Sequence, residues 1–217
     1  MKKTYLGLLA LLITGISCKK SSSTPDDAPK YMDFTAGAAS KYQTTNNLTA
    51  GTTTYTVTST NRDSTINGKV YHVFTNSGSM PNEYYNITGS DYYTFRSLGA
   101  ALANLTVESI YLKDNAAVGA SWNQVINLPL SGVPGTVPAT ITNTIAEKGI
   151  SRTVNSIAYT DVIHVTTTIA VQGLPAGSLA TDIQSYYARK SGLIESKNKL
   201  NAPILTLNVD QNTILLQ

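Results

Sequence analysis

The sequence predicts an all-β protein built on a curved antiparallel sheet, folded as a half-barrel or a sandwich. Charged residues make up only 13% of the 217-residue chain, and Thr, Ser and Asn supply most of its polarity. Thr mixed with Val, Ile and Tyr is typical of strands, because β-branched and aromatic side chains fit a pleated surface. Apolar and polar residues alternate in several segments, whereas helical periodicity is weak and confined to residues 98–105.

Alternation with a period of two predicts individual strands along the chain. The predicted strands cover residues 52–60, 70–74, 157–171 and 205–209. Asn67-Gly68 lies between the first two and predicts either a tight hairpin turn or a loop glycine. Asp161 interrupts the third strand and marks an expected β-bulge.

A weak internal repeat divides the predicted β domain, residues 31–217, into two halves, 31–112 and 113–217. The matching elements are residues 65–67 with Tyr71 against 153–155 with Tyr159, and Tyr92-Tyr93 against Tyr186-Tyr187. Duplication of one unit explains these matches, and so does the shared composition of Thr-rich strands. If the duplication is real, two sheets of similar topology face or continue each other.

The first residues have the pattern of a secretory signal peptide. Lys2 and Lys3 form a basic start, residues 5–16 are almost wholly apolar, and Ser17 provides a small residue before a cleavage site. The apolar run is too short to span a bilayer, which needs roughly 20 such residues. We therefore predict that residues 1–17 are removed on export.

Cys18, the only cysteine, directly follows the small residue, and this arrangement resembles the lipobox of bacterial lipoproteins. The resemblance implies cleavage after Ser17, a diacylglycerol thioether on Cys18, and acylation of its new amino group by a fatty acid such as palmitate. Gly15 stands where such boxes usually carry Leu. A plain secreted protein with one spare thiol is the alternative. By the same resemblance Lys20, with no acidic neighbour, favours the outer membrane, on either its periplasmic or its surface face.

Residues 18–30 form the predicted lipidated cysteine and a flexible tether. This segment is rich in Ser, Pro and Asp and offers little apolar surface to bury. Removal of the signal peptide takes away Lys2 and Lys3, so the formal charge falls from +3 to +1. A nearly neutral chain without a cluster of Lys or Arg does not favour nucleic acid as a partner. With Cys18 acylated, no disulfide can form.

Five short segments of the predicted β domain carry sequence motifs that occur in the same order in other proteins. They lie at residues 31–42, 67–71, 118–122, 159–165 and 186–194. The most specific is Tyr186-Tyr187-Ala188 followed by Gly192-Leu193-Ile194. Together they resemble a broad group of uncharacterised lipoproteins of the Gram-negative bacterial type. Ser40 stands where that group usually has a Trp. The resemblance implies an antiparallel β domain, such as the half-barrel of periplasmic lipoprotein carriers, and no activity.

Few residues suit catalysis. His72 and His164 are the only histidines, and neither has an Asp, Glu or His at metal-ligand spacing in the sequence. No nucleotide-binding, zinc-protease or nucleophile-elbow motif occurs. We therefore predict no catalytic residue, no metal and no cofactor. A carboxylate-dependent hydrolase is the less favoured alternative; Asp161 would be its best single candidate, and it would need a second carboxylate nearby.

Tyrosine doublets provide the best candidates for ligand binding. Adjacent residues on a strand point to opposite faces, so each doublet directs one ring to the core and one to the other face. The predicted ligand-binding residues are Tyr92, Tyr93, Tyr186 and Tyr187. A concave face of Tyr rings and Thr hydroxyls suits stacking on a sugar or lining an apolar groove, although such rings also simply fill a curved sheet.

These observations predict a membrane-anchored envelope lipoprotein that acts as a non-catalytic binding module. Its partner is expected to be a glycan, a lipid or a protein of the cell envelope, in addition to the membrane contacted by the lipid on Cys18. The alternative from another class is a structural or assembly subunit of an envelope complex, which would show an exposed edge strand or a flat apolar patch and no pocket.

Overall fold

The computed structural model describes residues 29–47, 51–77, 81–97, 104–129, 135–175, 177–203 and 207–217. Cys18 and the predicted signal peptide lie outside these residues. The same holds for most of the predicted tether and for most of segment 98–105.

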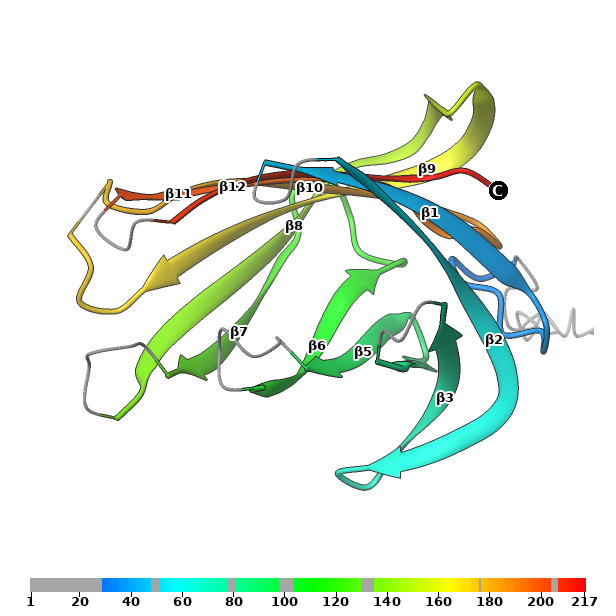
Figure 1. Ribbon diagram of the computed structural model, residues 1–217, viewed down its shortest axis with the longest axis horizontal. Helices are drawn as coiled ribbons and strands as arrows, with labels where there is room; N and C mark the ends of the chain where they lie inside the picture. Colours follow the sequence, from blue (N-terminus) through cyan, green and yellow to red (C-terminus); the bar gives the residue numbers. More distant parts are fainter. Residues whose placement is uncertain are drawn as a thin grey trace, which may run out of the picture.

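The described residues form twelve β-strands, and all of them belong to one antiparallel sheet. The strands are β1 (Ala39–Asn46), β2 (Thr52–Ile66), β3 (Lys69–Asn76), β4 (Glu83–Thr88), β5 (Asp91–Ser97), β6 (Thr106–Lys113), β7 (Ser121–Leu128), β8 (Val137–Val154), β9 (Ile157–Val171), β10 (Ala180–Ala188), β11 (Gly192–Ala202) and β12 (Leu207–Leu215). The sheet order is β6-β5-β4-β3-β2-β1-β12-β11-β10-β9-β8-β7, and the sheet curls into a nearly closed barrel (Figure 1). The predicted all-β class with a curved antiparallel sheet is confirmed.

Two hairpins show how local sequence shapes the barrel. The β2–β3 turn uses Asn67 and Gly68 with φ of 52° and 78°, and the β8–β9 turn uses Asn155 and Ser156 with φ of 47° and 65°. Successive residues with positive φ match the twist of a two-residue hairpin, so the tight-turn interpretation of Asn67-Gly68 is confirmed. Asp161 has a φ of 53° where the β8–β9 register shifts, and it therefore lies at the expected bulge.

The barrel has two different ends, because consecutive antiparallel strands place their connections alternately at one end and the other. One end carries the tight turns described above, and it is filled by residues 29–35, which we call the N-terminal plug. Tyr31 of the plug is fully buried; its N–H donates to the Tyr92 hydroxyl at 3.1 Å and its own hydroxyl donates to the Asp161 carbonyl at 3.0 Å. We call this the plugged end, and the opposite one the distal end.

The sheet order begins at β6 and finishes at β7, so these two strands meet without a backbone ladder. Side chains bridge them instead. The Trp122 indole N–H donates to the Ile110 carbonyl at 2.8 Å, the Asn143 amide donates to the same carbonyl at 3.3 Å, and the Gln124 amide donates to the Glu108 carbonyl. We call this junction the seam.

The twelve strands divide into two runs of six, β1–β6 and β7–β12, which correspond to the predicted repeat halves. The turns at residues 67–68 and 155–156 occupy equivalent places in the two runs. The match between Tyr92-Tyr93 and Tyr186-Tyr187 does not follow strand order, because the first doublet lies in the fifth strand of its half and the second in the fourth. Duplication itself stays a prediction.

Candidate ligand cavity

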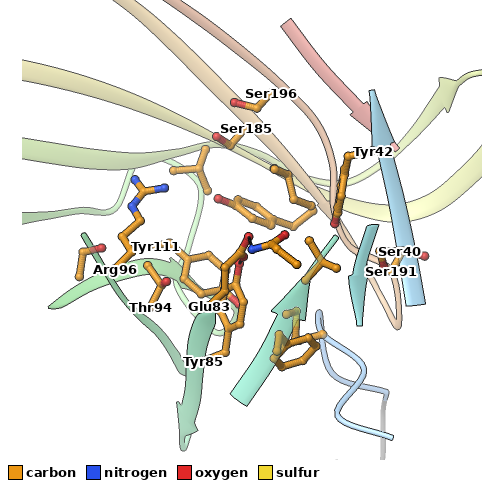
Figure 2. Close-up of a pocket in the computed structure, with 18 of the residues that line it drawn as sticks. Ser40, Tyr42, Glu83, Tyr85, Thr94, Arg96, Tyr111, Ser185, Ser191 and Ser196 are labelled. Carbon is orange, nitrogen blue, oxygen red and sulfur yellow. Dashed lines mark hydrogen bonds between the residues drawn. The ribbon is translucent and has the colours of Figure 1, made fainter. Parts of the chain in front are cut away.

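The barrel encloses a cavity of about 690 Å³ (Figure 2). Pockets for small molecules span roughly 300 to 1,000 Å³, so this one is large enough for an organic ligand. Its walls carry six aromatic rings: Tyr42, Tyr55, Phe74, Tyr85, Tyr111 and Tyr187. The cavity extends from Met32 of the N-terminal plug to Arg96 at the distal end, where Arg96 is exposed to solvent.

Strand alternation explains why most of these rings point inward. Tyr42 of β1 pairs in register with Tyr55 of β2, and both side chains lie on the inner face with Val57, two residues further along β2. The two tyrosine rings stack with centroids 5.5 Å apart. One wall of the cavity is therefore formed by a stacked pair on neighbouring strands.

A second group of rings continues around the cavity. Phe74 meets Tyr85 edge to face at 5.2 Å, Tyr85 meets Tyr111 at 5.9 Å, and Tyr111 meets Tyr187 at 5.4 Å. Tyr111 is the extra residue of a β5–β6 register shift, because Tyr92 pairs with Leu112 while the next residue of β5 pairs with Ile110. The bulge thus places an additional ring on the wall.

Glu83, at the start of β4, is a carboxylate among these rings (Figure 2). Its Oε1 accepts a hydrogen bond from Asn76 Nδ2 at 3.0 Å, and its Oε2 accepts one from the Tyr85 hydroxyl. The ion pairs formed by the described residues do not include Glu83. Within the described ranges, the side chains that donate to this carboxylate are neutral.

The tyrosine hydroxyls of the cavity stay protonated at neutral pH. Burial, followed by the charge of Glu83, raises the pKa of Tyr42, Tyr55 and Tyr85 above the usual value. Burial also raises the pKa of Tyr187 to about 12, although Ser185 and Arg96 act in the opposite direction. The rings consequently offer neutral O–H groups and apolar faces to a ligand.

The four predicted tyrosines have different surroundings. Tyr187 lines the cavity, whereas Tyr92 is fully buried at the plugged end and donates to Asp114 at 2.7 Å. On the other face of its strand, Tyr93 lies under the Lys69 ammonium, 3.3 Å from the ring centroid. The doublets direct their rings to opposite faces, as expected, and one of the four rings reaches the cavity.

Tyr186 belongs to a stack outside the cavity. Its ring lies 4.2 Å from the His164 ring, and the Arg152 guanidinium covers it at 3.4 Å. Arg152 in turn forms an ion pair with Glu195 at 2.5 Å. Tyr186 is thus enclosed by protein groups, and its ring faces are not free for a ligand in this structure.

The titratable residues singled out in the sequence have protein partners. His72 contacts Asp63 at 3.0 Å, and His164 contacts Glu147 at 2.8 Å. Asp161 forms an ion pair with Arg189. Within the described ranges, no group of three His, Cys, Asp or Glu side chains is arranged to hold a metal ion.

Sequence reasoning missed most of the cavity wall. Tyr187 is the one wall residue among the predicted ligand-binding tyrosines, and Tyr55 lies in the predicted strand 52–60. Nothing local distinguished Tyr42, Tyr111 or Glu83, because their inward position depends on barrel closure and on the β5–β6 bulge.

Comparisons with known proteins are few. No protein-family model matches the chain, and neither does any curated protein. Among solved structures, the chain is similar to a protein described as a putative lipoprotein from Parabacteroides distasonis ATCC 8503. The TM-score is 0.53 at 10% identity, with 88% of this chain and 99% of that one covered.

At 10% identity this likeness shows the fold alone. The fold predicted by the resemblance to bacterial lipoproteins is therefore supported, and the lipid on Cys18 stays a prediction. No helix in the described part of the chain has the length and hydropathy needed to cross a bilayer.

Proposed function

We propose that this protein is a non-catalytic binding protein that takes a small amphipathic molecule into the barrel and is anchored to the outer membrane through Cys18. The observation that carries the proposal is the cavity of about 690 Å³ with six aromatic rings on its walls. A cavity inside a barrel favours a lipid-like or other small ligand over a protein partner, because a protein would need an extended surface.

The lining of the cavity supports binding of an amphipathic molecule. Aromatic and aliphatic side chains offer apolar surface, and hydroxyl and amide groups offer hydrogen bonds at defined points. Ser185 and Ser196 lie on the wall across from Glu83 and Tyr85 (Figure 2). Apolar surface with a few directed polar groups is the usual composition of small-molecule pockets.

Filling the cavity tests this proposal. The full chain carrying Cys18→Ala, which avoids detergent during purification, would be titrated with the neutral fluorescent dye N-phenyl-1-naphthylamine. We expect saturable binding, and we expect Ser185→Trp to weaken it at least roughly tenfold by occupying the cavity. Val125→Trp is the matched control, because Val125 is 62% exposed on β7. Equal weakening by both variants, or no binding by the parent chain, would contradict the proposal.

The anchor has its own test. The full-length wild-type chain and Cys18→Ala would be expressed in a Gram-negative host, and the membranes would be fractionated. We expect the wild type in the outer membrane with lipid on Cys18, detected by mass spectrometry of the mature amino-terminal peptide, and the variant soluble or unprocessed. Identical behaviour of the two chains would mean that Cys18 is a free thiol.

A further inference from the structure

The Glu83 carboxylate lines the cavity beside several aromatic rings and forms no ion pair among the described residues. Its two oxygens accept hydrogen bonds from Asn76 and Tyr85, which are neutral, and the ion pairs of the described residues leave it out. A carboxylate that is partly removed from water is stabilised by a cation close to it. The protein provides hydrogen bonds here, and the cationic partner is missing among the described side chains.

Asn76 adds an unused acceptor beside this carboxylate. Its Nδ2 donates to the Pro81 carbonyl at 2.8 Å and to Glu83 Oε1 at 3.0 Å, so its orientation is determined by two acceptors. Its Oδ1 is buried and has no hydrogen-bond partner among the described residues. Buried acceptors are nearly always paired, so an unpaired one next to a carboxylate indicates a position for a donor.

Aromatic rings line the cavity near the same position. Tyr42, Tyr55, Phe74 and Tyr85 all line the cavity on this side, and the charge of Glu83 acts on the hydroxyls of the three tyrosines. Aromatic faces attract cations within about 6 Å of the ring centroid, and cages of such rings recognise quaternary ammonium groups. The acceptors and the rings therefore favour the same kind of ligand group.

We infer that the cavity ligand carries an ammonium group, which binds between Glu83, Asn76 and the rings of Tyr42, Tyr55 and Tyr85. This inference rests on the proposed function and specifies its ligand class: an amphipathic amine or quaternary amine, with its apolar part along the remaining rings of the barrel. Two cations also line the cavity. Lys190 lies beside the N-terminal plug. Arg96 follows Phe95, which pairs with Tyr84, so Arg96 lies across from Glu83 on β5; it is exposed to solvent and forms none of the ion pairs of the described residues with Glu83.

Probes that share one alkyl chain and differ in head-group charge test the inference. Dodecyltrimethylammonium, dodecanol and dodecyl sulfate, each below its micellar concentration, would compete with N-phenyl-1-naphthylamine on the full chain carrying Cys18→Ala. We expect the ammonium probe to bind roughly tenfold or more tightly than dodecanol, and dodecyl sulfate to bind most weakly. Equal affinities for the three probes, or a preference for the sulfate, would overturn the inference.

Substitutions at Glu83 and Tyr55 test whether this position causes the preference for the ammonium probe over dodecanol. Glu83→Gln keeps the size of the side chain and removes the charge, so the ammonium-over-dodecanol ratio is expected to fall roughly tenfold while dodecanol binding stays. Asp210→Asn, at an exposed carboxylate near Lys199, is the matched control and should leave the ratio unchanged. Tyr55→Leu should lower the ratio without removing a charge, and it provides a second test if Glu83→Gln does not fold. An unchanged ratio in the folded variants would overturn the assignment to this position.

The outcomes separate this inference from the proposed function. If the dye and all three probes bind with no dependence on head-group charge, the cavity remains the binding site. The inference that its ligand carries an ammonium group would then be wrong. Failure of the dye and of every probe to bind would contradict the cavity function, and the inference with it.

Discussion

The two halves of the barrel meet at two junctions that are built in different ways. β1 and β12 form a backbone ladder from Tyr42 opposite Leu215 to Asn46 opposite Gln211, extended by a hydrogen bond from Lys41 N–H to the Gln217 carbonyl at 2.6 Å. β6 and β7 are bridged by side-chain donors that reach β6 carbonyls. The comparison shows that one barrel can be closed by the backbone on one side and by specific residue types on the other.

This difference determines which junction a mutation can open. Any residue except proline supplies the N–H and C=O groups of a backbone ladder, so the β1–β12 junction tolerates side-chain replacement. The seam instead requires the indole of Trp122 and the amide of Gln124. We therefore expect single substitutions to weaken the seam far more than the ladder.

The largest effect is expected from Trp122→Ala. The change removes a partly buried ring and the hydrogen bond to the Ile110 carbonyl, so the free energy of unfolding should fall by about 3 kcal/mol. Chemical denaturation measures the loss, and hydrogen exchange should show faster exchange in β6 and β7. Trp122→Phe is the control, since it keeps most of the ring and loses about 1 kcal/mol. Equal losses for the two variants would mean that packing of the ring contributes little.

A smaller effect is expected from Gln124→Leu. The substitution keeps the approximate volume of the side chain but leaves the Glu108 carbonyl without its donor from β7, which costs about 1 to 2 kcal/mol. Chemical denaturation again measures the change. Asn123→Leu, on the exposed face of the same strand, should cost less than 0.5 kcal/mol, on the order of a surface substitution. A larger loss at residue 123 than at 124 would contradict the seam as described.

Acid should weaken the seam region through Glu108. Burial favours a higher pKa for this carboxyl, but the Lys69 ammonium, which donates a hydrogen bond to Glu108 Oε1 at 2.6 Å, holds the pKa below its usual value. The stabilisation is therefore complete above the unfolded pKa of about 4.3 and is lost as the pH falls through the lower folded pKa. Stability measured from pH 6 to 3 should decline less steeply for Glu108→Gln, by roughly 1 kcal/mol or less. An unchanged slope would show that the Lys69 pair contributes nothing.

The smallest effect is expected at the ladder. The hydroxyls of Thr44 and Thr213 share a hydrogen bond of 2.9 Å across the β1–β12 junction. Thr44→Val removes this bond and leaves the backbone ladder intact, so the loss should be about 0.5 to 1 kcal/mol. Urea denaturation of this variant beside Trp122→Ala completes the comparison. A loss as large as that of Trp122→Ala would show that the ladder also depends on side chains.

Local sequence patterns predicted much of the fold. Alternation located the strand at residues 157–171, Asn67-Gly68 indicated a two-residue turn, and Asp161 indicated a bulge, because each of these features depends on neighbouring residues. The pairing of β1 with β12 and the burial of Tyr31 depend on residues more than 100 positions apart, and no local pattern reports them.

The candidate site was predicted less completely. The doublet rule correctly placed the two rings of each pair on opposite faces, and it could not tell which ring faces the cavity. For Tyr186 and Tyr187 the answer depends on a β10–β11 register shift, and for Tyr111 it depends on the shift between β5 and β6. Glu83 and Asn76 become neighbours only when β3 and β4 pair, so the hydrogen bond between them has no signature in sequence.

Both ends of the described chain lie at the plugged end of the barrel, so they could be joined there by a short linker. The Lys30 carbonyl accepts a hydrogen bond from Lys190 N–H, and the Gln217 carbonyl accepts one from Lys41 N–H, so both ends of the described chain lie on this side. A circular permutant that joins these ends and opens the connection at residues 114–120 would keep every strand pair. Its backbone would then follow the ladder without a break from β7 through β12 and β1 to β6, and its new termini would flank the seam.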